Sequence, residues 1–318
     1  MESKRNMHNN YINISNIEKE IMFYNRVDEL KLLSDNFFEC KYFVRENKQK
    51  YLLVITSINN EKRIFEKANF LLNLNSFDIN THLIISYGKC KNPNFLYVVY
   101  NWIDGLTLEN YLQKQDYFHQ YNIGVMCGEK LKSIHDFTQT KSNNCIISND
   151  IKECLSKKDK YAEFKSDFPY ISIFFDEIAK YKNKVFDREI LAHLHGDFKI
   201  SNIIIRNNTI YLIDWVYGEK QPAIKEFVRN LFNSNISKKF AKGLIDGYFR
   251  GSINNEMWEQ IFIFSIIHQL ELLDWIGLFD FITSDFVTQQ HQNFLIQYND
   301  LKTIIPLYYR EEKTNESK

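Results

Sequence analysis

The sequence contains few of the residues that break or cross-link a chain. Its 318 residues include only 10 glycines, 4 prolines and 5 cysteines, with no repeat and no low-complexity linker. Since glycine and proline concentrate in the linkers between independent domains, their scarcity favours lobes that pack directly together. The cysteine count is odd and includes no CxxC pair. This spacing argues against a disulfide framework or a zinc site and favours reduced thiols in a cytoplasmic protein.

The chain also lacks an excess of charge and a long uncharged apolar run. Its 40 Lys and Arg balance 40 Asp and Glu, which gives no support for a nucleic-acid partner. Residues 1–15 are mostly polar, so we expect no signal peptide. The most hydrophobic stretch, residues 261–281, contains acidic residues and is expected to be a buried helix. We therefore expect no membrane partner either, while the oligomeric state stays open.

The predicted secondary structure changes near Trp102. Before it, short apolar runs predict strands, and residues 61–74 carry the apolar stripe of a helix. The expected strands are residues 42–44, 51–55, 82–87 and 95–100. After it the pattern is helical, apart from one predicted hairpin at residues 203–213 with two asparagines at its turn. This order predicts an α+β fold with a β-rich lobe, residues 1–101, and a larger helical lobe, residues 102–318.

Two motifs on either side of that hairpin are the most informative part of the sequence. HGDFKISN, which contains Asp197 and Asn202, precedes the hairpin. LIDW, which contains Asp214, stands at its end. An aspartate and an asparagine five residues apart on one loop, with a second aspartate after the hairpin, can converge on one point. Phosphoryl transfer needs this arrangement, because a base must orient the attacking hydroxyl while oxygen ligands hold Mg²⁺ against the nucleotide. The alternative is an ordinary turn between a helix and a strand.

HGDFKISN followed by LIDW resembles the catalytic loop and metal-binding aspartate of the aminoglycoside phosphotransferase and choline kinase family, whose fold is bilobal and protein-kinase-like. The resemblance implies an enzyme that moves the γ-phosphoryl group of ATP (or GTP) to a hydroxyl of a small molecule. It implies that Asp197 is the catalytic base and that Asn202 and Asp214 hold Mg²⁺. The acceptor would be an antibiotic such as an aminoglycoside, or an amino alcohol such as choline.

The resemblance also extends to both lobes. The string FLYVVYNWIDG resembles the last strand of the nucleotide-binding lobe and the hinge that receives adenine, so Tyr100 and Trp102 are expected to bind the cofactor. Ser34, in a phosphate loop without glycine, and Ser201, in the catalytic loop, are expected to bind it too. In the helical lobe, PAIKEFVR resembles the segment that follows the metal-binding aspartate, with Glu226 at the acidic position.

The sequence departs from the family at the cation of the third strand. The family carries Lys or Arg there, oriented by a glutamate of the next helix, whereas this chain has Val54, and the helix register favours Lys67 over Glu66. Lys199, two residues after Asp197, is therefore expected to act in catalysis by placing its ammonium on the transferred phosphoryl group. Lys67 is the reserve candidate, and the alternative for Lys199 is a solvated loop lysine.

The acceptor site is expected on the hydrophobic helix of residues 261–281. His268, Glu271 and Trp275 share one face with Phe264, and an aromatic ring with a carboxylate suits an ammonium group. The alternative is a core helix that satisfies its polar groups locally. A second hypothesis for the whole chain also stays open: a catalytically weak or inactive kinase-fold protein with a binding or structural role, like those of spore coats. A protein kinase is less compatible, since no APE segment follows Asp214.

Overall fold

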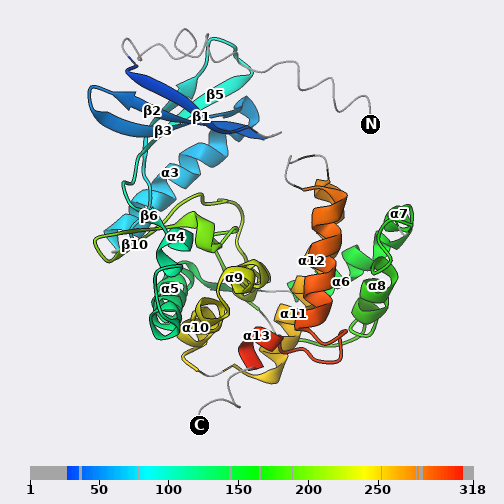
Figure 1. Cartoon of the computed structure of the whole chain (residues 1–318). Coiled ribbons are helices and arrows are strands. Elements are labelled where there is room, and N and C mark those ends of the chain that lie inside the picture. The colour runs from blue at the N-terminus through cyan, green and yellow to red at the C-terminus, as the bar shows by residue number, and fades with distance from the viewer. Residues whose placement is uncertain are drawn as a thin grey trace. The chain divides into compact units, whose positions relative to one another are not determined.

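The computed structural model describes residues 27–35, 38–77, 79–142, 145–164, 166–187, 189–251, 253–276, 278 and 282–310 (Figure 1). The chain divides into two compact units, of which the first runs to Asp104 and takes in Leu278, while the second begins at Gly105. The first contains an antiparallel sheet and the second is mainly helical, so the predicted α+β class is confirmed. Within the described ranges, no helix is long and apolar enough to cross a membrane.

The sheet of the first unit has five antiparallel strands in the order β1-β2-β3-β5-β4. Their bounds are Glu29–Asp35 (β1), Glu39–Glu46 (β2), Gln49–Ser57 (β3), Ile84–Lys89 (β4) and Phe95–Asn101 (β5). The turn between β2 and β3 places Asn47 and Lys48 at positive φ (48° and 69°), as in tight turns that match the twist of a hairpin. After β3, the short η2 (Ile58–Asn60) leads into helix α3 (Glu61–Ser76), which lies along the sheet (Figure 1).

Buried apolar residues lie on both faces of this sheet. One face carries a cluster made of Tyr42, Val44, Leu53, Ile55, Cys90 and Val99. The other face includes Lys41, Val54 and Val98, which lie directly opposite one another on β2, β3 and β5. Helix α3 lies on this second side, because Nζ of Lys67 is 5.4 Å from the ring centroid of Tyr100, two residues along β5 from Val98.

The second unit consists of helices with three short strand groups. Its longer helices are α5 (Tyr117–Thr138), α6 (Ile146–Ser156), α8 (Ile171–Ala179), α10 (Lys238–Phe249), α11 (Asn255–Glu271) and α12 (Ser284–Gln297). Its shorter helices are α4 (Leu108–Leu112), α7 (Lys158–Ala162), η3 (Ile200–Asn202), η4 (Ala223–Arg229), α9 (Asn230–Ile236), η5 (Leu272–Trp275) and α13 (Leu307–Arg310). Its strands are β6 (Leu106–Thr107), β7 (Thr140–Lys141), β8 (Ile190–Ala192), β9 (Ile203–Arg206), β10 (Thr209–Leu212) and β11 (Gln221–Pro222).

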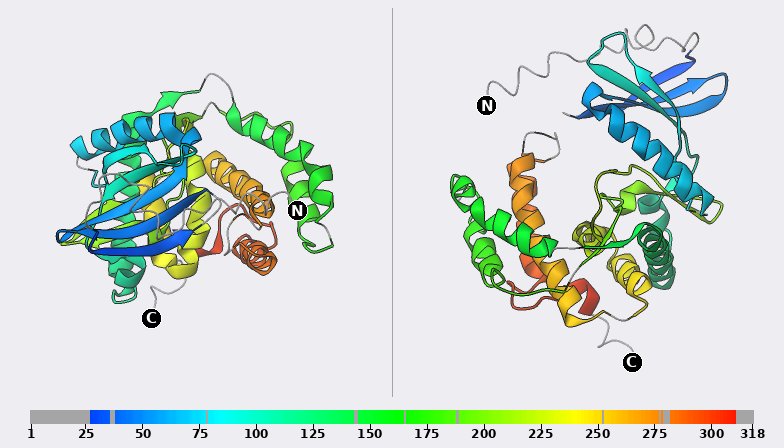
Figure 2. Two further views of the ribbon diagram at one scale, coloured as in Figure 1. Left: turned by 90° about the horizontal axis from the view of Figure 1, so that it is seen from above. Right: turned by 180° about the vertical axis from the view of Figure 1, so that it is seen from behind.

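Helices α5 and α10 lie side by side at unusually close range (Figure 2). A Cβ added at Gly128 of α5 would lie 2.2 Å from the carbonyl oxygen of Leu244 on α10. The relation is reciprocal, because a Cβ added at Gly247 of α10 would lie 2.2 Å from the carbonyl oxygen of Val125 on α5. Glycine therefore sets the separation of these helices.

The predicted hairpin at residues 203–213 is confirmed as β9 and β10. Its turn consists of Asn207 and Asn208, both at positive φ (49° and 59°), and Ile203 pairs with Leu212 at the open end. The hairpin thereby begins directly after Asn202 and ends two residues before Asp214.

The expected single helix over residues 261–281 is wrong in its extent. Helix α11 begins earlier, at Asn255, and ends at Glu271, where the backbone tightens into the 3₁₀ turn η5 up to Trp275. Much of the tail of the expected helix, residues 277 and 279–281, lies outside the described residues. Eleven consecutive residues of α11, Gln260–Leu270, are buried on all sides of the helix. The helix therefore belongs to the core, and its polar side chains must find partners inside the protein.

Candidate active site

The predicted catalytic loop, residues 195–202, is held to the end of strand β10 by the side chain of His195. Its Nε2 donates a hydrogen bond to the carbonyl oxygen of Ile213 (2.9 Å), and its Nδ1 accepts one from the amide of Asp197 (3.3 Å). These roles assign the neutral tautomer protonated on Nε2. Burial lowers the pKa of His195, which keeps the ring neutral. His195 is thus a structural link between the loop and the chain around Asp214.

Glu226 fixes the start of the same loop. Its carboxylate accepts hydrogen bonds from the amides of His195 (2.7 Å) and Gly196 (3.0 Å), and lies 3.5 Å from Nε2 of His135 at the end of α5. Gly196 has a φ of 83°, and a Cβ there would come within 2.9 Å of the Cβ of Val216. Both the backbone conformation and the space therefore require glycine before Asp197.

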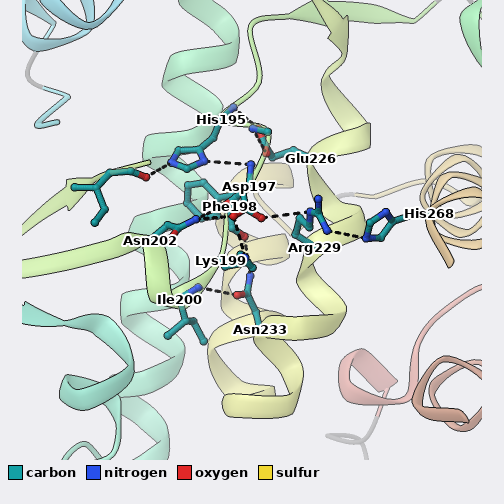
Figure 3. Close-up of polar contacts among 12 residues, drawn as sticks. His195, Asp197, Phe198, Lys199, Ile200, Asn202, Glu226, Arg229, Asn233 and His268 are labelled. Atoms are coloured by element: carbon teal, nitrogen blue, oxygen red, sulfur yellow. Dashed lines mark hydrogen bonds and ion pairs between the residues drawn. The ribbon is translucent and has the colours of Figure 1, made fainter. Parts of the chain in front are cut away.

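Asn202 and Asp197 contact one another directly (Figure 3). Nδ2 of Asn202 donates to the backbone oxygen of Asp197 (2.9 Å) and to its Oδ2 (2.8 Å). Because the NH₂ end of the amide faces Asp197, its carbonyl oxygen Oδ1 is the end available to a cation. On the opposite side of the loop, Asn233 accepts from the amide of Ile200 (2.9 Å) and donates to the carbonyl oxygen of Phe198 (3.2 Å).

Asp214 lies in a segment that two backbone hydrogen bonds tie to the loop. The amide of Ile213 donates to the carbonyl oxygen of Asn202 (3.0 Å), and the amide of Val216 donates to that of His195 (2.9 Å). Asp214 itself adopts a φ of 62°, a left-handed conformation that aspartate tolerates better than most residues. The structure thus places Asp214 beside the loop that carries Asn202.

The oxygens of Asn202 and Asp214 fit Mg²⁺ better than a transition metal. Among the described residues, no group of three or more His, Cys, Asp and Glu side chains could hold a metal ion. Mg²⁺ does not need such a cage, because it is commonly bound by one or two protein oxygens together with substrate phosphates and water. The donor set is therefore compatible with a cation that arrives with a nucleotide.

Two cations flank the carboxylate of Asp197. Nζ of Lys199 lies 2.9 Å from Oδ2, and Nε of Arg229 lies 3.5 Å from Oδ1. The part of Lys199 in catalysis stays a prediction. Sequence analysis did not single out Arg229, because its place beside the loop depends on the 3₁₀ helix η4, on which it follows Glu226 by three residues. Residues three apart on a 3₁₀ helix share one side, so an arginine there lies beside the same loop.

Arg229 also occupies the cluster that was expected to bind the acceptor (Figure 3). Its Nη1 donates to Nε2 of His268 (2.8 Å), and its guanidinium carbon lies 5.1 Å from the ring centroid of Trp275. Glu271 is farther out, with Oε2 3.8 Å from Nδ1 of His268. Burial and the charge of Arg229 lower the pKa of His268 to about 4, so the ring is neutral at neutral pH. The positive charge beside this aromatic and acidic cluster is therefore the guanidinium of Arg229 and not that of a bound ligand.

A cavity of about 320 Å³ opens beside this cluster. Its lining includes Gly196, Arg229, Phe264, His268, Glu271 and Trp275. The volume lies within the range of small-molecule sites. The structure thus brings the predicted acceptor residues together around one cavity next to the predicted catalytic loop, while their role in substrate binding stays a prediction.

The residues predicted to bind the nucleotide lie in both units. Ser34 is on β1, and Tyr100 is at the end of β5, where it is buried and stacked on His82 with ring centroids 4.4 Å apart. Trp102 donates its backbone amide to the carbonyl oxygen of Lys50 (3.3 Å). Ser201 is exposed on η3, directly before Asn202. Their part in nucleotide binding stays a prediction.

Comparison with known proteins agrees with this fold. Residues 29–261 match the sequence model of a family described as the phosphotransferase enzyme family. No curated protein matches the chain. One similar solved structure is a thermostable mutant of an aminoglycoside phosphotransferase in ternary complex with AMP-PNP and hygromycin B, 12% identical, covering 88% of this chain and 98% of that one, with a TM-score of 0.66.

Two further solved structures extend the likeness. Amicoumacin kinase in complex with AMP-PNP, Ca²⁺ and Ami is 15% identical, with 95% and 97% coverage and a TM-score of 0.61. Choline kinase from Cryptosporidium parvum is 16% identical, with 93% and 97% coverage and a TM-score of 0.55. At these identities the likeness shows the kinase-like fold alone. The family match covers most of the chain and confirms the predicted family and the prediction of a phosphotransferase, so the chain belongs to the phosphotransferase enzyme family.

Proposed function

We propose that this chain is an ATP-dependent O-phosphotransferase with Asp197 as its base and Asn202 and Asp214 as its Mg²⁺ ligands. The contact between Asn202 and Asp197 carries the proposal, because it turns the amide oxygen of one metal ligand away from the base. The backbone hydrogen bonds around Asp214 supply the second ligand beside it. When bound, MgATP would supply the phosphoryl group and part of the charge neutralisation.

The side chains around Asp197 decide which of its oxygens can act as the base. Oδ2 of Asp197 is engaged by Asn202 and Lys199, whereas Oδ1 makes the longer contact with Arg229. Oδ1 is therefore the oxygen that would orient the acceptor hydroxyl and take its proton. The hydroxyl oxygen forms the new bond to the γ-phosphorus, while the bond from that phosphorus to the bridging oxygen breaks and ADP leaves.

The acceptor is proposed to be a small hydroxyl compound bound in the cavity beside Trp275. Similar structures bind hygromycin B or, as choline kinase, act on a cationic alcohol. Because Arg229 already covers Trp275 and hydrogen-bonds His268, a quaternary ammonium would meet a like charge there. This contact favours an acceptor that places neutral hydroxyl groups, and no ammonium group, beside Trp275.

An inactive binding protein remains the second candidate, favoured by Val54 at the position of the missing cation. Calorimetry with MgATP, followed by a transfer screen over aminoglycosides, macrolides, choline and sugars, separates the two. The proposal requires MgATP binding and transfer to at least one acceptor, and Asp197→Asn must abolish that transfer. Nucleotide binding without transfer to any acceptor, or no binding at all, would move the inactive protein ahead.

A further inference from the structure

On the neighbouring strand, a lysine lies directly opposite Val54, the residue that replaces the family's cation. Lys41 on β2 pairs with Val54 on β3, which in turn pairs with Val98 on β5. Directly opposite residues of antiparallel strands project to the same face, with Cβ atoms roughly 5 Å apart. The side chain of Lys41 therefore leaves the sheet beside that of Val54, one strand away.

The face that Lys41 shares is the one that carries helix α3 and Tyr100. The apolar cluster of Tyr42 and Leu53 occupies the other face, because these residues alternate with Lys41 and Val54 along their strands. On its own face the side chain of Lys41 is 19% exposed, so its stem is covered and its ammonium is held in a restricted region.

A β-bulge in β1 adds a hydroxyl to the same row. The register of β1 against β2 shifts between Leu32 and Ser34, so that Ser34, and not Leu33, lies opposite Lys41. Bulges re-aim side chains in this way and are frequent next to functional sites. The row across the sheet is therefore Ser34, Lys41 and Val54, which joins the predicted phosphate-loop serine to a cation.

The ammonium of Lys41 is oriented by a carboxylate of its own strand. Nζ lies 2.9 Å from Oε1 of Glu39, two residues earlier on the same face. In the family, a glutamate of the following helix orients the strand cation. Here Glu66 on α3 lies toward Lys62 instead, at 3.8 Å. Lys41 on β2 thus has an acidic partner of its own, as the family's strand cation has.

We propose that Lys41, with Ser34 beside it, is the residue of the first unit that binds the nucleotide phosphates. This inference rests on the proposed function, because it presumes that the chain binds ATP. The other two lysines considered have different positions: Lys199 contacts Asp197 at 2.9 Å, and Lys67 lies over the ring of Tyr100. Lys41 alone among the three stands across the strand from Val54.

The test removes the ammonium of Lys41 and then introduces one at position 54. Lys41→Met is expected to weaken MgATP binding about 10-fold or more, the scale of one lost charge-assisted contact, while adenosine binding stays unchanged. Adding Val54→Lys to that variant should restore much of the loss, since the ammonium again points into the same region. Lys62→Met is the matched control, because Lys62 is 89% exposed on α3. Calorimetry gives the affinities, and thermal unfolding verifies that each variant is folded.

Several outcomes would overturn the inference. Unchanged MgATP affinity in Lys41→Met does so, and so does an equal loss for MgATP and adenosine, which would show a general disturbance of the sheet. A loss in Lys67→Met but not in Lys41→Met would assign the role to α3 instead. If the wild-type chain does not bind MgATP at all, the proposed function fails together with this inference, whereas the other results leave that function standing.

Discussion

Asn202 donates two hydrogen bonds to Asp197, one to its backbone oxygen at 2.9 Å and one to Oδ2 at 2.8 Å. This geometry gives one amide two tasks: its nitrogen holds the base, and its oxygen faces the proposed metal position. Replacement by alanine removes both. We expect Asn202→Ala to lower kcat by about 10²-fold or more and to raise the Mg²⁺ concentration needed for half-maximal rate. An unchanged Mg²⁺ dependence would contradict the assignment of the amide oxygen.

Arg229 is expected to stabilise the fold of the site as well as to line it. Its guanidinium is largely buried and contacts Asp197, His268 and Trp275. Its removal takes one of two cations from Asp197 and takes the charged donor from Nε2 of the buried His268, and an unsatisfied buried acceptor typically costs about 1–3 kcal/mol. Arg229→Gln should therefore lower the free energy of unfolding by that order in urea denaturation. Arg250→Gln, an exposed arginine after α10, is the control and should change it little.

The protonation of His268 should appear in the pH dependence of stability. Its pKa is lowered to about 4 in the folded chain by burial and by Arg229. In the unfolded chain the pKa returns to roughly 6.5, so only the unfolded state takes up a proton between these pH values. This group does not affect stability above about pH 6.5, and below it the stability falls toward pH 4, by about 3 kcal/mol in total.

A variant isolates this group from the other buried histidines, such as His195. His268→Gln keeps an acceptor for Arg229 but removes the titration, so its stability should fall less steeply than that of the wild type between pH 6.5 and 4. Parallel curves for the two proteins would show that His268 is not the group responsible. Histidine titration by NMR gives the same pKa directly, and Arg229→Gln should raise it.

The contact between α5 and α10 predicts a sharp difference between two glycines. Gly128→Ala would place a methyl group 2.2 Å from the carbonyl oxygen of Leu244, so the helices must separate. We expect a loss of about 2–3 kcal/mol in the free energy of unfolding, as for an overpacked interior. At Gly218 a Cβ would meet no atom within 4 Å, so Gly218→Ala is the control. Equal stability of both variants would contradict the close helix contact.

The sequence predicted those features that depend on neighbours along the chain. Strand alternation and the asparagine pair located the hairpin, because turn type and strand periodicity are local properties. The catalytic loop and Asp214 flank that hairpin, so their proximity followed from it. The boundary of α11 was less predictable, since an apolar helix continues by pattern until tertiary packing and the 3₁₀ turn end it.

The positions of Lys41 and Arg229 depend on relations that spacing does not encode. Lys41 is opposite Val54 only through the pairing of β2 with β3, and Ser34 joins the row only because β1 contains a bulge. Arg229 contacts Asp197 because η4 is a 3₁₀ helix anchored by Glu226. Each depends on register or helix type, and a shift of one residue would turn the side chain away.

The division of roles between Asp197 and Asp214 is the central claim, and nucleotide affinity with and without Mg²⁺ tests it most directly. Calorimetry should show that the wild type and Asp197→Ala bind ATP tightly only with Mg²⁺, because the base acts on the acceptor and not on the phosphates. Asp214→Ala should lose the Mg²⁺-dependent part of binding, since its carboxylate is the proposed metal ligand. An equal loss of Mg²⁺-dependent binding in both variants, or full retention in Asp214→Ala, would contradict the account.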